Sequence, residues 1–365
     1  MKYIFLDTNI FHNNWFAKNA NFKLLFNYLE NTGSVLLLSE LVCEEIENNR
    51  KRELDSIVDM IKQEIKKSQK LKQNAIDFNP EQIKEESYNI KELLLDKVSN
   101  IVFISYEHIS QNVVVKRALK RKKPFQDGEK GYRDTLIWLS FLDYLKSNAI
   151  SEDIYFITNN KDDFFNKDKI DFHQDLKDDM ENYKLECVIY PFDSLFAFTE
   201  KHIDKNEHGV NKTELYDEHL NNIDSELEIE SLYFINSIGE AAFNDILTNN
   251  RLRTFPYVST LIAHSIELIE GVEDPEILSY SMLSKDIVYV NFRFNLRICI
   301  LRFTVPNTEY YQNKEQIDNI YYEIKSDENY TTFCGYVRIF LDVTFEYNMA
   351  EKTIDGFNIE SIDFK

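Results

Sequence analysis

Four acidic residues stand where an apolar segment ends or where a helix is expected to begin. They are Asp7, Glu45, Asp134 and Asp163. Asp7 directly follows the apolar run at residues 3–6, and Asp134 precedes the apolar residues of an expected helix. Carboxylates that crowd together repel one another unless a cation compensates their charge. If these acids converge, they form a site for a hard divalent cation, which prefers oxygen ligands.

The segments around these acids alternate between expected strands and expected helices. Apolar runs at residues 2–7, 34–38, 101–105, 153–158 and 186–190 are typical of buried strands. Helices are expected over residues 16–30, 39 to about 73, 81–99, 113–123, 135–146 and 191 to about 202. This alternation predicts a parallel sheet with right-handed crossovers. Sites in such sheets form beyond the carboxyl ends of the strands, where Asp7, Ser39 and Asn159 fall.

The pattern of apolar and polar residues changes after the polar segment 203–210, and this change predicts two domains. The first covers residues 1–204 and contains a helical insertion at about 47–99, and the second covers residues 211–365. Helices are expected within 222–248, and alternating segments at 287–305, 331–347 and 352–364 predict an antiparallel sheet. The second domain is therefore expected to be α+β. It contains no catalytic constellation, and Phe292 and Phe294 are expected to pack in a sheet rather than bind nucleic acid.

Charge is distributed unevenly along the chain. The net charge is −21, of which residues 206–365 carry −16, with 12 Lys/Arg against 28 Asp/Glu. This acidity disfavours nucleic-acid binding by the second domain, because phosphate contacts supply most of that affinity. It leaves a protein partner or an oligomer open there. Basic residues gather in the first domain at 50–52, at 62–72 and at 116–123, where Lys116, Arg117, Lys120 and Arg121 are the candidates for guiding the substrate. Two interpretations stay open, namely solvated helix faces or a basic rim that follows a phosphate backbone.

The spacing of the cysteines and the lengths of the apolar stretches indicate in which cellular compartment the protein lies. The four cysteines are scattered and lack CxxC spacing, so free thiols in a reducing cytoplasm are expected. No apolar stretch approaches the length that spans a bilayer, and the N-terminal segment begins with a strand rather than a cleavable signal. We therefore expect a cytoplasmic protein that does not associate with membranes.

The order and setting of the four acids resemble the PIN family of metal-dependent nucleases over about residues 1–200. Glu45 closes the segment 39–45 (Ser-Glu-Leu-Val-Cys-Glu-Glu), which fits the family's second acidic motif. Asp134 lies in the segment 131–138 (Gly-Tyr-Arg-Asp-Thr-Leu-Ile-Trp), which matches its third. The fourth position departs from the familiar motif, because Asn160 stands two residues after Thr158, where many relatives carry Asp. By resemblance, Asp163 takes that role.

The resemblance implies a three-layer α/β/α domain with a central parallel sheet and a site for Mg²⁺ or Mn²⁺. Asp7 and Asp134 would contact the principal metal, Asp163 would complete the site, and Glu45 would orient a water or hold a second ion. The residues that would orient these acids or bind substrate are Thr8, Asn9, Arg133, Thr158 and Asn160. The implied activity is metal-dependent endoribonuclease cleavage of RNA, or of single-stranded nucleic acid more generally.

Several alternatives remain beside this hypothesis. A degenerate PIN-like module would bind RNA or protein without cleaving it. A phosphohydrolase of the haloacid dehalogenase type ranks last, because Asp7 is followed by Thr-Asn rather than by the Asp-x-Asp motif. Arg133 could contact a phosphate or simply pair with a neighbouring acid. Glu44 and Glu45 lie about 100° apart around a helix, so both cannot point into one site. The family pattern implies that Glu45 and Asp163 face the site and that their neighbours Glu44 and Asp162 point away.

Overall fold

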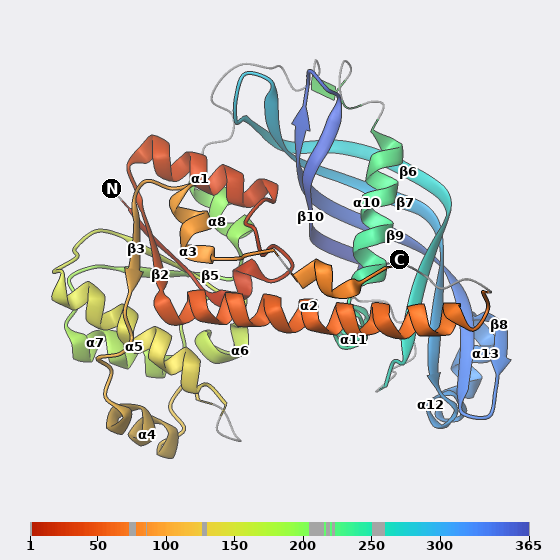
Figure 1. The fold of residues 1–365 in the computed structure, drawn as a ribbon, viewed down its shortest axis with the longest axis horizontal. Helices are drawn as coiled ribbons and strands as arrows, with labels where there is room; N and C mark the ends of the chain where they lie inside the picture. The colour runs from red at the N-terminus through yellow and green to blue at the C-terminus, as the bar shows by residue number, and fades with distance from the viewer. Residues whose placement is uncertain are drawn as a thin grey trace. The chain divides into compact units, whose positions relative to one another are not determined.

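The computed structural model describes residues 2–72, 78–84, 86–125, 130–203, 215–216, 220, 223–249 and 260–364. The chain divides into two compact units, Met1–Lys18 with Phe22–Ile203, and Asn19–Asn21 with Asp204–Lys365. Apart from residue 203, the expected linker at 203–210 lies outside the described residues, as do the expected boundaries at 204 and 211. The fold class is confirmed in both units, with a parallel sheet in the first and an antiparallel sheet in the second (Figure 1).

The first unit is built on a parallel sheet of five strands. They are β1 (Tyr3–Leu6), β2 (Val35–Ser39), β3 (Ile101–Ile104), β4 (Ile154–Ile157) and β5 (Ile189–Phe192), in the order β3-β2-β1-β4-β5. The central strand β1 pairs with β4 so that Leu6 lies opposite Ile157. Because both strands end at the same edge, Asp7 and Thr158 become neighbours although 150 residues separate them in sequence.

Helices cover both faces of this sheet. They are η1 (Thr8–Phe11), α1 (Ala20–Thr32), α2 (Glu40–Gln69), η2 (Pro80–Lys84), α3 (Ile90–Leu95), α4 (Gln111–Leu119), α5 (Tyr132–Ser147), α6 (Lys161–Phe164), α7 (Gln174–Tyr183) and α8 (Leu195–His202). Side chains alternate between the faces of a strand. On β4, Phe156 contacts Trp138 of α5, whereas its neighbour Tyr155 contacts Phe198 of α8. The first unit therefore has the expected three layers, with the sheet between two layers of helices. No described helix is both long enough and apolar enough to cross a membrane.

Two local predictions for the first unit are wrong. The helix expected over 81–99 is instead η2 followed by α3, because the Asn89 side chain accepts hydrogen bonds from the Lys91 and Glu92 amides and begins a new helix. The fifth strand lies later than expected and includes Pro191. Proline lacks an amide hydrogen, and it is tolerated there because β5 forms the edge of the sheet.

The second unit is an antiparallel sheet with helices. Its strands are β6 (Ala263–Met282), β7 (Ile287–Pro306), β8 (Tyr322–Ser326), β9 (Tyr330–Asn348) and β10 (Thr353–Phe364), in the order β10-β9-β7-β6 with β8 on β9. Its described helices are α10 (Asp224–Ser237), α11 (Glu240–Asn249), α12 (Asn307–Gln312) and α13 (Lys314–Ile320). Phe292 and Phe294 are buried, which confirms that they pack in a sheet.

Strand β6 is the longest of the described second-unit elements that the sequence analysis missed, the others being β8, α12 and α13. It forms one edge of the sheet and exposes many polar side chains, so it lacks the apolar alternation of β7 and β9. It also contains Pro275, which lies in a register break between Glu273 and Glu276. Asp274 in the same break has a left-handed φ of 53°. A bulge of this kind accommodates a proline that would otherwise remove a hydrogen bond from the ladder.

Gly131 provides a test of how α5 is positioned. It precedes α5 with φ +100°, and a Cβ there would clash with the carbonyl oxygen of Pro124. Gly33 is a matched control, because its φ is also positive (+61°) and a Cβ there would meet open space. We expect Gly33→Ala to cost roughly 1–2 kcal/mol of unfolding free energy and Gly131→Ala to cost more. Denaturant unfolding would measure both, and equal losses would contradict the proposed clash.

Candidate active site

Asp7 lies at the end of the central strand and is almost fully buried. Its Oδ1 accepts a hydrogen bond from the Thr8 amide (2.7 Å), and its Oδ2 accepts one from the Thr158 hydroxyl (2.6 Å). Burial raises the pKa of Asp7 to about 6, and the two hydrogen bonds oppose that rise. Both carboxylate oxygens are therefore oriented by neighbours on β1 and β4.

Glu45 lies near the start of α2 and connects the surroundings of two other acids. The helix begins after Ser39, whose hydroxyl accepts a hydrogen bond from the Leu41 amide (3.2 Å). Glu45 Oε2 accepts a hydrogen bond from the Thr8 hydroxyl (2.6 Å), and Oε1 lies 2.6 Å from Arg133 Nη1. Of the two roles left open for Arg133, the structure therefore shows an ion pair with an acid.

The neighbouring acid Glu44 lies outside this cluster. Its side chain is exposed and accepts a hydrogen bond from the Tyr106 hydroxyl (3.0 Å). Adjacent residues of a helix point in directions about 100° apart, so only one of the two glutamates faces the sheet edge. The prediction that Glu44 points away is confirmed.

Asp134 lies in the first turn of α5, beside Arg133. Its pKa rises to about 7, first because of burial and then because of the negative charges of Asp7, Asp163 and Glu45, whereas Arg133 lowers it. The four acids therefore lie within electrostatic reach of one another. Within the part of the chain that the structure describes, no hydrogen bond or ion pair involves the Asp134 carboxylate. Proton uptake by Asp134, like the binding of a cation, would reduce the local repulsion.

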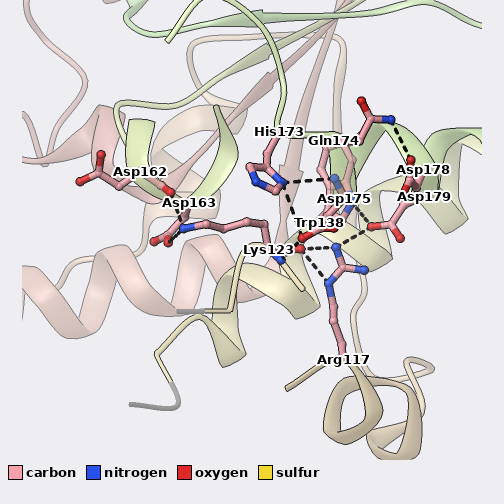
Figure 2. A network of polar contacts seen from close by, with 10 residues as sticks. All are labelled: Arg117, Lys123, Trp138, Asp162, Asp163, His173, Gln174, Asp175, Asp178 and Asp179. Atoms are coloured by element: carbon pink, nitrogen blue, oxygen red, sulfur yellow. Dashed lines mark hydrogen bonds and ion pairs between the residues drawn. The ribbon is translucent and has the colours of Figure 1, made fainter. Parts of the chain in front are cut away.

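Asp163 lies on the short helix α6, just after β4, and its side chain is buried. Its Oδ2 accepts a hydrogen bond from the Asn160 side chain (2.8 Å), and its Oδ1 lies 3.7 Å from Lys123 Nζ. Figure 2 shows the Lys123 side chain reaching toward this helix. The adjacent Asp162 is exposed and lies 3.6 Å from Lys169 Nζ, which confirms that it faces solvent.

The polar residues expected around the acids form one hydrogen-bonded set. The Thr158 hydroxyl, which donates to Asp7, accepts hydrogen bonds from the Asn9 side chain (3.3 Å) and the Asn160 amide (3.0 Å). The Asn9 side-chain oxygen accepts a hydrogen bond from the Asn159 amide (3.0 Å). This set joins the loops that follow β1 and β4, and it fixes the loop residues next to Asp7 and Asp163.

The sequence analysis missed the Asn159 amide and did not foresee the position of Lys123. Lys123 was expected at the end of the basic helix 113–123, but it lies beyond the end of α4, and its ammonium contacts residues about 40 positions later in the chain. No local signal in the sequence marks such a contact. Asn159 was placed at the strand end, but its role is performed by a backbone group, which every residue except proline carries.

The prediction that Arg117 guides the substrate is wrong. Arg117 is 7% exposed and pairs with Asp179 (2.6 Å), so it does not belong to a basic rim. The reason is helical spacing, since Val114 and Arg117 share the buried face of α4. The other three residues of that group, Lys116, Lys120 and Arg121, are exposed.

The donor set of the site consists of oxygen ligands. The four acids bring carboxylate oxygens, and the neighbouring Thr and Asn side chains bring hydroxyl and amide oxygens, which suits Mg²⁺ or Mn²⁺ rather than Zn²⁺. Four carboxylates against Arg133 and Lys123 leave a formal charge of −2 when all are ionised, which a divalent cation would match. Among the described residues, however, no three acidic, histidine or cysteine side chains already meet at metal-binding distance.

Comparison with known proteins agrees with this geometry. Residues 4–164 match the family model described as the PIN domain. The match includes all four acids, and the remainder of the chain has no family match. PIN domains are in general nucleases, and the family typically uses divalent metal ions. Comparisons with curated proteins and with solved structures gave no match.

The raised pKa of Asp134 predicts that stability depends on pH. In the absence of metal, folding favours the protonated acid, so its stabilising contribution is complete below about pH 4 and is lost as pH rises toward 7. Asp134→Asn removes this loss, and in EDTA at pH 8 we expect it to unfold at higher temperature than the wild type. The gain is roughly 2–4 kcal/mol at most, and it should disappear near pH 4.

Thermal melts of both proteins across that pH range would measure this effect. Asp162→Asn is the matched control, because it removes an exposed acid one position from Asp163. A stability difference between Asp134→Asn and the wild type that does not change with pH would contradict the raised pKa.

Proposed function

From a nuclease-type PIN domain over residues 4–164, we propose that this protein is a metal-dependent endoribonuclease. The observation that carries the proposal is the electrostatic coupling of Asp7, Glu45, Asp134 and Asp163 at the carboxyl edge of the parallel sheet. A fold gains no stability from crowding four acids. Their retention at one edge is therefore best explained by the binding of cations and of the phosphates that accompany them.

Asp7, Asp134 and Asp163 would hold a Mg²⁺ or Mn²⁺ ion, with Glu45 orienting a water or a second ion. Such an ion, when bound, supplies positive charge that lowers the pKa of water and stabilises negative charge on phosphate oxygens. Thr158 and the Thr8 amide keep the Asp7 carboxylate in one orientation. The Thr8 hydroxyl and Arg133 do the same for Glu45. The residues of this chain therefore preorganise the acids before substrate arrives.

The substrate path is proposed to follow exposed lysines of the first unit. Lys116 on α4 and Lys120, the residue that directly follows this helix, are exposed. In contrast, Lys62 and Lys67 of α2 pair with Glu81 and Glu64, so acids already balance their charge. The second unit carries the acidic charge of the chain and is assigned no phosphate contact.

A second candidate function is a PIN module that binds RNA without cleaving it. Two acids already have cationic partners, with Glu45 beside Arg133 and Asp163 beside Lys123. Such pairing relieves part of the repulsion without a metal, which favours a site that no longer needs one. Cleavage and binding measurements on the same protein distinguish the two functions.

The nuclease proposal predicts that Asp7→Asn and Asp134→Asn each abolish metal-dependent cleavage of RNA, because each removes a metal ligand. Purified wild-type protein would be incubated with a panel of RNAs and Mg²⁺ or Mn²⁺, with EDTA as the metal-free reaction. Glu44→Gln and Asp162→Asn are controls that should cleave at the wild-type rate. RNA binding by the wild type without cleavage under any of these conditions would favour the non-cleaving module.

The proposed path predicts a change in salt dependence. Each phosphate contact to a single strand contributes about 0.7 to the slope of log affinity against log salt. The double substitution of Lys116 and Lys120 by Ala should flatten that slope by about 1.4, measured by fluorescence anisotropy of labelled RNA. The double substitution of Lys62 and Lys67 by Ala should change it little. Equal flattening of the salt slope by both double substitutions would show that the substrate path includes α2 as well.

A further inference from the structure

A buried polar network fixes the backbone of Lys123 beside the acidic site (Figure 2). The Lys123 carbonyl accepts hydrogen bonds from the Arg117 guanidinium (Nε, 2.9 Å), and the Lys123 amide donates to Asp175 Oδ2 (2.9 Å). Both backbone groups of this residue are therefore held by charged side chains. The direction in which the Lys123 side chain leaves the loop is fixed accordingly.

The network continues into the protein interior through Asp179. Arg117 Nη2 lies 2.6 Å from Asp179 Oδ2, which also accepts a hydrogen bond from Trp138 Nε1 (3.0 Å). Arg117 and Asp179 are 7% and 8% exposed. A buried ion pair adds little net stability over an apolar pair of the same shape, because both ions lose their hydration. Its value here is geometric, since the planar guanidinium bonds the Lys123 carbonyl through both Nε and Nη2 while Nη2 also contacts Asp179, a fork that a lysine with its single nitrogen lacks.

The positive charge of the Lys123 ammonium is only weakly compensated by the groups around it. It donates to the Asp162 carbonyl (2.6 Å), which is neutral, and its distance of 3.7 Å from Asp163 Oδ1 is too long for a hydrogen bond. By contrast, Arg133 lies 2.6 Å from Glu45. The Lys123 side chain is 25% exposed, so its ammonium lies between the interior and solvent. A positive charge held in this way is suited to an incoming anion.

We propose that Lys123 binds a non-bridging oxygen of the substrate phosphate next to Asp163, and that Arg117 and Asp179 are positioning residues that hold it there. This inference rests on the proposed function, because it names a phosphate-binding residue for that same site. A lysine acts as a compact point charge toward phosphate, and a fixed backbone reduces the entropy lost when the ammonium makes the contact. The ion pair with Asp163 keeps the ammonium at the site when no substrate is present.

The test uses full-length protein with Lys123→Met, Lys123→Arg and the control Lys161→Met. Lys161 lies on the same helix as Asp163, but its ammonium pairs with Asp193 (2.6 Å). We expect Lys123→Met to lower kcat/KM for RNA cleavage by roughly 10- to 100-fold, the range for a lost hydrogen bond to a charged group. Lys123→Arg should recover part of that loss, and Lys161→Met should cleave like the wild type.

A second readout separates this inference from the nuclease proposal. RNA affinity would be measured with Ca²⁺ in place of Mg²⁺, so that binding is observed independently of turnover. Lys123→Met should bind more weakly than Lys161→Met, with melting temperatures that match the wild type. If the wild type cleaves no RNA, the nuclease proposal fails and this binding difference still decides the role of Lys123. Wild-type cleavage and binding by Lys123→Met would overturn the inference.

The positioning role has its own test in Arg117→Lys. This variant keeps the charge, but it has one nitrogen in place of the two, Nε and Nη2, that bond the Lys123 carbonyl. We expect RNA affinity in Ca²⁺ and kcat/KM to fall together, by a smaller factor than in Lys123→Met, because the lysine is present but poorly placed. Adding Arg117→Lys to Lys123→Met should lower them little further. Wild-type affinity and kcat/KM in the folded variant would remove Arg117 from the positioning role. If the variant does not fold, the comparison of Lys123→Met with Lys161→Met remains decisive for the phosphate contact.

Discussion

The mutual repulsion of four carboxylates is the constraint on which the first unit depends. The order of the parallel strands brings the ends of β1 and β4 together, and the starts of α2 and α5 add the other two acids. The fold reduces the repulsion differently at each acid. Hydrogen bonds hold Asp7, cations pair with Glu45 and Asp163, and proton binding is favoured at Asp134. At Asp134, burial and the neighbouring negative charges raise the pKa to about 7.

Aromatic side chains pack behind the site. Phe5 and Phe156 stack across the two central strands (4.8 Å between ring centroids), and Trp138 packs on the same face. Trp138 also donates a hydrogen bond to Asp179, so the apolar core and the buried ion pair share one side chain. Aromatic packing of this kind supplies stability that offsets the destabilising acids at the sheet edge. Core residues that take no part in the chemistry therefore compensate for the stability lost by crowding the acids.

The second unit shows why net charge alone does not locate a binding surface. Its sheet contains arginines, but in the described residues each pairs with acids, as Arg293 does with Asp342 (2.6 Å) and Arg338 with Glu273 (3.2 Å). An arginine that is already paired with an acid neutralises a phosphate less, so fewer counterions leave the nucleic acid. The pairing of these described arginines agrees with the proposed substrate path on the first unit.

Local sequence signals determined the fold class and the positions of the acids. A strand end places Asp7. Helix geometry allows only one of Glu44 and Glu45 to face the site, and the family pattern selects Glu45 and Asp163. Tertiary structure alone decided the rest, namely the burial of Arg117, the ion-pair partner of Arg133, the edge strand β6 and the placement of Lys123. These depend on contacts between segments far apart in the chain. Periodicity records which face of an element is apolar, whereas the partner of a buried charge is set by packing between elements.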